Sequence, residues 1–182
     1  MKQIDFENGT ITGNICNAAI PMMTAQVLSL LDNIVDRIYI ARIPGIGSTA
    51  LGAVGLCFPV IIIITAFSNL FGGGGAPLFA IQRGMGQDRK AGRIMSTSYT
   101  MLCGCAVLLM ILGLVFAGPW LKLFGASEAA LVYACPYMMI YLLGTFPSMA
   151  TTGLNPFINA QGYAPTGMLS ITIGAVANLI LD

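Results

Sequence analysis

Residues 51–71 read LGAVGLCFPVIIIITAFSNLF, a run without a single charged side chain. An α-helix rises about 1.5 Å per residue, so about 20 apolar residues cross the ~30 Å hydrocarbon core of a bilayer. Lipid offers no hydrogen-bond partner to the backbone, and a helix satisfies its own backbone groups internally. The segment is therefore predicted to be a membrane-spanning helix.

The composition of the whole chain also indicates a membrane protein, and membrane lipid is the expected partner of its surface. Of 182 residues, 57% are hydrophobic and 8% are charged, whereas a soluble domain carries roughly 25% charged residues. The net charge of +1 gives no indication of a nucleic-acid partner, and the absence of histidine excludes imidazole metal ligands and imidazole proton relays. We expect no metal site and no cofactor beyond a coupling ion.

The cysteines are interpreted as small apolar helix residues. They form no CxxC pair and lie in apolar stretches, which gives little support to a metal or redox role. The residues are Cys16, Cys57, Cys103, Cys105 and Cys135.

Hydrophobic length predicts an all-α, polytopic transmembrane bundle. The expected helices cover about 15–40, 51–82, 94–117, 130–152 and 166–182. The second is expected to be broken near Gly72–Gly75, because four consecutive glycines weaken a helix and broken helices line cavities in transporters. A flexible helix end at the membrane surface is the alternative. The first helix is too long for the apolar region of a signal peptide and is interpreted as an uncleaved span.

The distribution of basic residues predicts the orientation. Four of the eight Lys and Arg residues lie in the segment 83–93, between the second and third helices. Cytoplasmic loops are enriched in basic residues, so this loop and the N-terminus are expected on the cytoplasmic side. The loop expected to start at Gly118-Pro-Trp120 then faces outward. Asp36, late in the first helix, and Asp182, late in the fifth, are expected at the same depth in the outer half of the membrane.

Two acidic faces carry the candidate chemistry. Asp32 and Asp36 are spaced i, i+4 on the first helix, with Arg37 adjacent, and Asn178 and Asp182 repeat that spacing on the fifth. A carboxylate in a span costs about 2.5–3.5 kcal/mol on insertion scales, so such residues usually face a polar cavity. Two nearby carboxylates in a low dielectric take up a proton or a sodium ion. The alternative is that each group is a solvated helix end.

Pro21 lies inside the first helix. Proline removes one backbone hydrogen bond and kinks a helix, so Pro21 is a candidate bend below Asp36. A purely structural role is the alternative.

At these residues the chain resembles the MATE (multidrug and toxic compound extrusion) family. The matching stretches are the first-helix pattern Ala19-Ile-Pro-Met-Met23 with Val35-Asp-Arg-Ile-Tyr-Ile40, the second-helix pattern Thr49-Ala-Leu-Gly-Ala-Val-Gly55 with Phe58-Pro59, and Asn155-Pro-Phe-Ile-Asn-Ala-Gln-Gly162 followed by Asn178-Leu-Ile-Leu-Asp182. Ile43-Pro-Gly-Ile-Gly47 is most similar to the MepA-type bacterial branch. Ala41 departs from the pattern, where the family often has glycine.

The resemblance implies a bacterial cytoplasmic-membrane exporter of small cationic or amphipathic drug-like compounds, working by antiport with H⁺ or Na⁺. The family has twelve helices in two six-helix lobes, and Asp36, Asn178 and Asp182 match its N-lobe cation site, with Pro21 at the bend of the first helix. The chain matches helices one to five only. It is therefore expected to be a fragment that lacks its C-terminal lobe and does not transport by itself, because alternating access needs two lobes.

Three other functions compete with export. A lipid-linked oligosaccharide flippase of the same superfamily often has a basic central cavity, whereas the spans here contain almost no Lys or Arg. A non-transporting helical membrane subunit would be complete at this length. An enzyme is not expected, since there is no histidine and no GxSxG motif.

Overall fold

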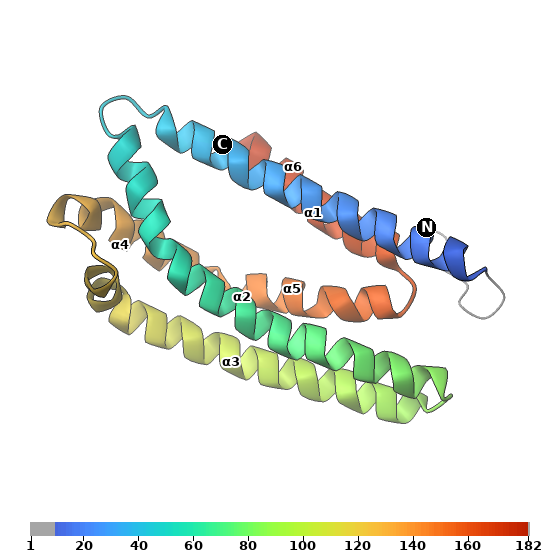
Figure 1. The fold of residues 1–182 in the computed structure, drawn as a ribbon. Helices are drawn as coiled ribbons and strands as arrows, with labels where there is room; N and C mark the ends of the chain where they lie inside the picture. The colour runs from blue at the N-terminus through green and yellow to red at the C-terminus, as the bar shows by residue number, and fades with distance from the viewer. Residues whose placement is uncertain (1–9, 182) are drawn as a thin grey trace.

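The computed structural model describes residues 10–181 and is helical, with no strand among these residues (Figure 1). Six helices follow one another along the chain: α1 (Ile11–Ala41), α2 (Gly47–Gly84), α3 (Asp88–Leu123), α4 (Glu128–Leu143), α5 (Thr145–Ala160) and α6 (Ala164–Leu181). The predicted all-α transmembrane class is confirmed.

Membrane-spanning length and apolarity are found in α1, α2 and α3, and in α4 and α5 when these two are taken as one span. The connections alternate between the two ends of the bundle, so successive spans run antiparallel (Figure 1). Large apolar side chains such as Ile62, Leu108 and Val115 are 56–66% exposed. A surface of this kind is stable against lipid rather than water.

The fourth span is bent, where a single helix was expected over 130–152. The α4 and α5 axes meet at 53°, with the break at Gly144. Pro147 explains the position, because it has no N–H to donate to the carbonyl of Leu143, the last residue of α4. α5 then continues to Ala160, beyond the expected end of the span.

The predicted break in the second helix is wrong. α2 is continuous from Gly47 to Gly84, and two of its four consecutive glycines lie against other helices. A Cβ atom at Gly72 would lie 2.6 Å from the Gly153 carbonyl oxygen in α5, and one at Gly75 would lie 2.7 Å from the Phe157 ring. The glycines therefore allow close helix packing, and the free energy of that packing outweighs their low helix propensity.

The third helix is also longer than expected. α3 runs through Pro119 to Leu123, so the predicted loop at Gly118-Pro-Trp120 is helical instead. Ala117 and Leu121 on either side of this proline are fully buried. Their packing holds the last turns in place despite the one backbone bond that proline removes.

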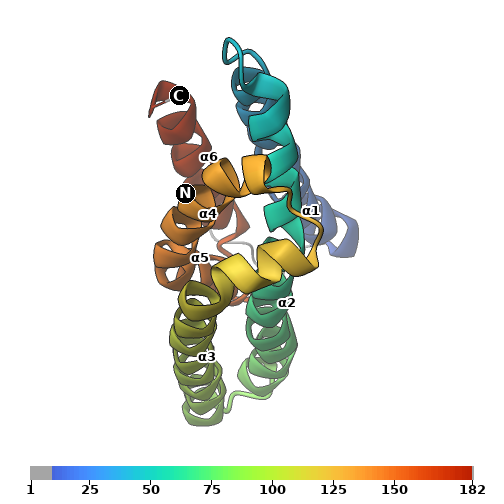
Figure 2. The same ribbon diagram turned by 90° about the vertical axis from the view of Figure 1, so that its left-hand side faces the viewer.

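The helices form two groups. α2 packs against α3, α4 and α5, and α1 packs along α6. Figure 1 shows α1 and α6 together along one edge of the bundle and α2 and α3 along the other. α4 also packs against α3, and the view from one end shows it crossing the bundle beside α2 (Figure 2). This arrangement places parts of α1, α2, α4 and α6 around one space.

Candidate functional site

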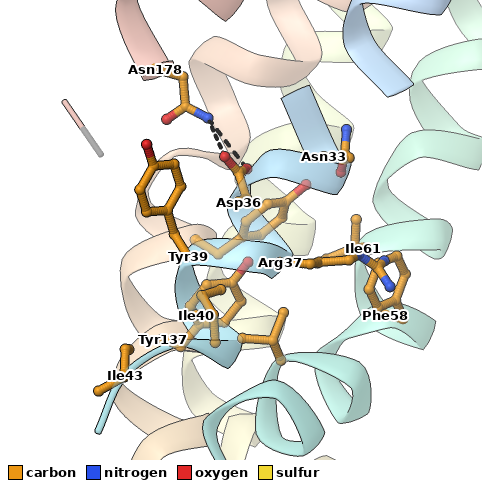
Figure 3. A pocket seen from close by; sticks show the side chains of 12 residues that line it. Asn33, Asp36, Arg37, Tyr39, Ile40, Ile43, Phe58, Ile61, Tyr137 and Asn178 are labelled. Carbon is orange, nitrogen blue, oxygen red and sulfur yellow. Dashed lines mark hydrogen bonds between the residues drawn. The ribbon is translucent and has the colours of Figure 1, made fainter. Parts of the chain in front are cut away.

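The α1–α6 contact brings Asp36 and Asn178 together. The Asn178 Nδ2 group donates to both carboxylate oxygens of Asp36, at 3.2 and 3.3 Å (Figure 3). The same Nδ2 atom lies 3.5 Å from Oδ2 of Asp32. The i, i+4 spacing of the two aspartates puts both on the face of α1 that meets α6. The sequence predicted the polar residues on each helix, and the structure shows that the two helices are neighbours. Asp182 lies outside the described residues.

Asp36 and Asn178 lie together on the wall of a cavity of about 660 Å³. Its other walls come from α1, α2 and α4, and they are largely aromatic and aliphatic. The lining residues are Asn33, Asp36, Arg37, Tyr39, Ile40, Ile43, Val54, Phe58, Ile61, Tyr137, Tyr141 and Asn178. Ligand cavities have this character, mostly apolar with a few converging polar groups, and a volume of about 300–1,000 Å³.

Two tyrosines supply the α4 wall of the cavity. Tyr137 and Tyr141 are spaced i, i+4, and their rings stack with centroids 6.5 Å apart at an interplanar angle of 24°. Each ring offers an apolar face together with a hydroxyl group. Neither tyrosine was predicted from the sequence, although their spacing placed them on one face of the fourth span.

The α2 wall contains a cation–π contact. The Arg37 guanidinium lies 4.5 Å from the centroid of the Phe58 ring. Asn33, one turn earlier on α1, also lines the cavity and donates from Nδ2 to the Ser29 carbonyl oxygen at 2.7 Å. From the sequence, Arg37 was identified only as a neighbour of Asp36. The i, i+4 spacing of Asn33 and Arg37 is a signal of a second polar face on the first helix.

Pro21 lies within α1, which continues through it without a break. Its missing N–H leaves the carbonyl of Asn17 without a donor from the i+4 position. Pro21 and Asp36 are fifteen positions apart, which corresponds to roughly 22 Å at about 1.5 Å per residue. Bending at this proline stays a prediction.

The groups at this site have the right chemistry for a small hard cation. Carboxylate oxygens and the amide oxygen of Asn178 are the ligands that such ions prefer. Within residues 10–181, no group of three or more His, Cys, Asp or Glu side chains is arranged to hold a metal ion. Binding of H⁺ or Na⁺ at Asp36 and Asn178 stays a prediction.

Apolar spans around a cavity with an intramembrane carboxylate are typical of a membrane transporter, since such a residue usually marks an ion or substrate path. The apolar helices show a multi-pass membrane protein. The MatE family model matches residues 21–182, and the chain belongs to that family.

Two curated relatives show what the chain resembles. It is 25% identical over 177 residues to the multidrug export protein MepA of Staphylococcus haemolyticus, covering 97% of this chain and 39% of MepA. It is also 25% identical over 168 residues to an FAD transporter of Shewanella oneidensis, covering 92% of this chain and 36% of that protein. The relatives are transporters rather than enzymes.

A solved structure shows the same fold. The outward-facing conformation of a multidrug resistance MATE family transporter superposes with a TM-score of 0.90 at 26% identity, covering all of this chain and 40% of the other. The chain thus spans about two fifths of the length of the relatives that it matches.

Proposed function

We propose that this chain forms the ion-coupling part of a multidrug exporter in the bacterial cytoplasmic membrane, in which entry of H⁺ or Na⁺ drives the export of cationic or amphipathic compounds. The observation that carries the proposal is the contact between Asp36 of α1 and Asn178 of α6 on the wall of a 660 Å³ cavity. A carboxylate at membrane depth is costly, so one that is present there usually has a function.

The hydrogen bonds explain how an ion would change the structure. Asn178 donates to an ionised Asp36, which only accepts hydrogen bonds. A proton on Asp36 turns one carboxylate oxygen into a donor, and a sodium ion occupies its lone pairs. In either case Asn178 can no longer donate to both carboxylate oxygens as it does here, so occupancy of the site would change the α1–α6 contact. Pro21 provides a place where α1 can bend in response.

Transport also needs a second lobe against which this one can move. The chain covers 39% of MepA and 40% of the matched transporter structure. We therefore propose that the activity belongs to this lobe together with a C-terminal lobe. The α2–α3 connection, which has basic residues on both sides, and the N-terminus would face the cytoplasm, as positive-inside bias favours.

The membrane potential is a sufficient driving force when each cycle moves one net positive charge inward, as in exchange of one ion for a neutral compound or of two ions for a monovalent cation. One elementary charge moving through about 150 mV releases roughly 3.5 kcal/mol, at about 2.3 kcal/mol per 100 mV. At about 1.4 kcal/mol per tenfold, this supports a gradient of about two to three hundredfold.

The test is Asp36→Asn in the natural protein that contains this chain. We expect loss of drug resistance and of ethidium efflux in a drug-sensitive bacterial host, at unchanged membrane expression, because the variant keeps the side-chain shape but does not ionise. Asp88→Asn is the matched control, since Asp88 begins α3 outside the cavity. Unchanged efflux by Asp36→Asn would contradict the proposal.

The cavity charge also bears on the flippase alternative. Its lining contains one guanidinium, Arg37, beside one carboxylate, Asp36. A strongly basic cavity would suit a lipid-linked oligosaccharide, which carries phosphate groups. The balanced lining favours drug export over that function.

A further inference from the structure

Arg37 and Asp36 are adjacent in sequence, but they face different walls of the cavity. Figure 3 shows Arg37 extending toward Phe58 of α2, while Asp36 points toward Asn178 of α6. Consecutive residues on a helix are separated by about 100° around its axis. The cavity therefore presents two charges of opposite sign on separate surfaces.

The contact with Phe58 places the Arg37 guanidinium over an aromatic ring, which carries no anionic group to compete for its N–H donors. The guanidinium carbon lies 4.5 Å from the ring centroid, and this contact limits the motion of the side chain. Arg37 can thus bind an anion with less loss of entropy than an unsupported side chain.

The surroundings of Arg37 are suited to a ligand. The side chain is exposed, and in the described part of the chain the only ion pair joins Lys122 and Glu128 at the α3–α4 connection. Asn33 adds a polar group one turn away on the same face. Tyr137 and Tyr141 supply ring faces on the α4 wall.

We propose that Arg37, held over the Phe58 ring, is an anion subsite that binds the carboxylate of an amphoteric aromatic substrate. The cationic end of that substrate lies toward the acidic wall, and its rings lie against the tyrosines. The proposal deepens the proposed export function and rests on it, by naming the class of compound that this cavity selects. A bidentate guanidinium–carboxylate pair gives the geometric selectivity.

A matched pair of dyes tests the subsite. Rhodamine 110 carries a carboxylate, and rhodamine 123 is its methyl ester, so the two differ in the anionic group alone. Their binding to the purified natural protein in detergent is followed by fluorescence anisotropy. We expect Arg37→Gln to weaken the binding of rhodamine 110 about tenfold or more, the size typical of a charged hydrogen bond, and to change that of rhodamine 123 less than about twofold.

Further variants separate charge from geometry. Arg37→Lys keeps the charge but lacks the planar fork, so it should lose a large part of the preference for rhodamine 110. Phe58→Leu removes the ring that orients Arg37 and should reduce the same preference several-fold. Lys122→Gln is the control, since it removes a cation that does not line the cavity and should change neither affinity.

The result distinguishes this proposal from the coupling function. Equal affinities for the two dyes in the unmodified protein, or equal losses of both dyes in Arg37→Gln and Arg37→Lys, would overturn the subsite. If Arg37→Gln weakens the binding of rhodamine 110 but not that of rhodamine 123, the subsite is supported, whether or not Asp36→Asn abolishes efflux. Retained efflux in Asp36→Asn, with a selective Arg37 effect, would refute only the coupling proposal.

Discussion

The contact between α2 and α5 can be tested with single methyl groups. In Gly72→Ala, the new Cβ would lie 2.6 Å from the Gly153 carbonyl oxygen and 2.9 Å from its Cα, both backbone atoms. Ordinary contact distances are 3.4–4 Å, so the two helices must separate. Gly73→Ala is the matched control, because nothing lies within 4 Å of its Cβ.

The expected magnitude follows from two opposing effects. Replacing glycine by alanine inside a helix stabilises it by about 1 kcal/mol, and this applies to both variants. Overpacking a well-packed contact costs about 1–3 kcal/mol, and only Gly72→Ala incurs it. The free energy of unfolding should therefore be about 1–3 kcal/mol lower in Gly72→Ala than in Gly73→Ala.

A cysteine-reactive fluorogenic dye provides the assay. Cys57 is fully buried between helices, so in a background whose other cysteines are replaced by serine its reaction with the dye reports unfolding of the detergent-solubilised protein during heating. We expect Gly73→Ala to unfold at or above the temperature of the unmodified protein and Gly72→Ala below it. Equal shifts in the two variants would refute the close approach of α2 and α5. A broken α2, as the glycine run alone predicts, would also make the two positions equivalent.

Two smaller predictions concern the same core. The Ser68 hydroxyl donates to the Met149 carbonyl oxygen of α5, whereas the Thr65 hydroxyl donates only within α2. Ser68→Ala should therefore lower the free energy of unfolding by about 0.6–1.7 kcal/mol, and Thr65→Ala should lower it less. A larger loss in Thr65→Ala would contradict the hydrogen bond between α2 and α5. A membrane-permeant maleimide should label the exposed Cys16 in the folded protein and label the buried Cys57 only after denaturation, with mass spectrometry as readout. Rapid labelling of Cys57 in the folded protein would argue against its packing.

Much of the fold was predictable from the sequence because the bilayer acts on local properties. The uncharged run at 51–71 and the other apolar stretches have the length of a span, whatever they pack against. The polar groups Asp36 and Asn178 could also be identified one helix at a time, because a polar side chain in an apolar span is conspicuous in its own right. Pro147 marked the bend in the fourth span, although the bend was not predicted from it.

Contacts between helices were decided only by the tertiary structure. Gly72 could either break α2 or allow the backbone of Gly153 to pack closely against it, and the outcome depends on this partner 81 positions away in the chain. Ser68 and Met149, which share a hydrogen bond, are separated by the same number of positions. The meeting of α1 with α6 likewise joins residues 142 positions apart. Helix propensity and hydropathy do not account for such partners, since packing energy arises only when two surfaces meet. The sequence by itself therefore determined the spans and their polar residues, and the tertiary structure decided that these residues share one cavity.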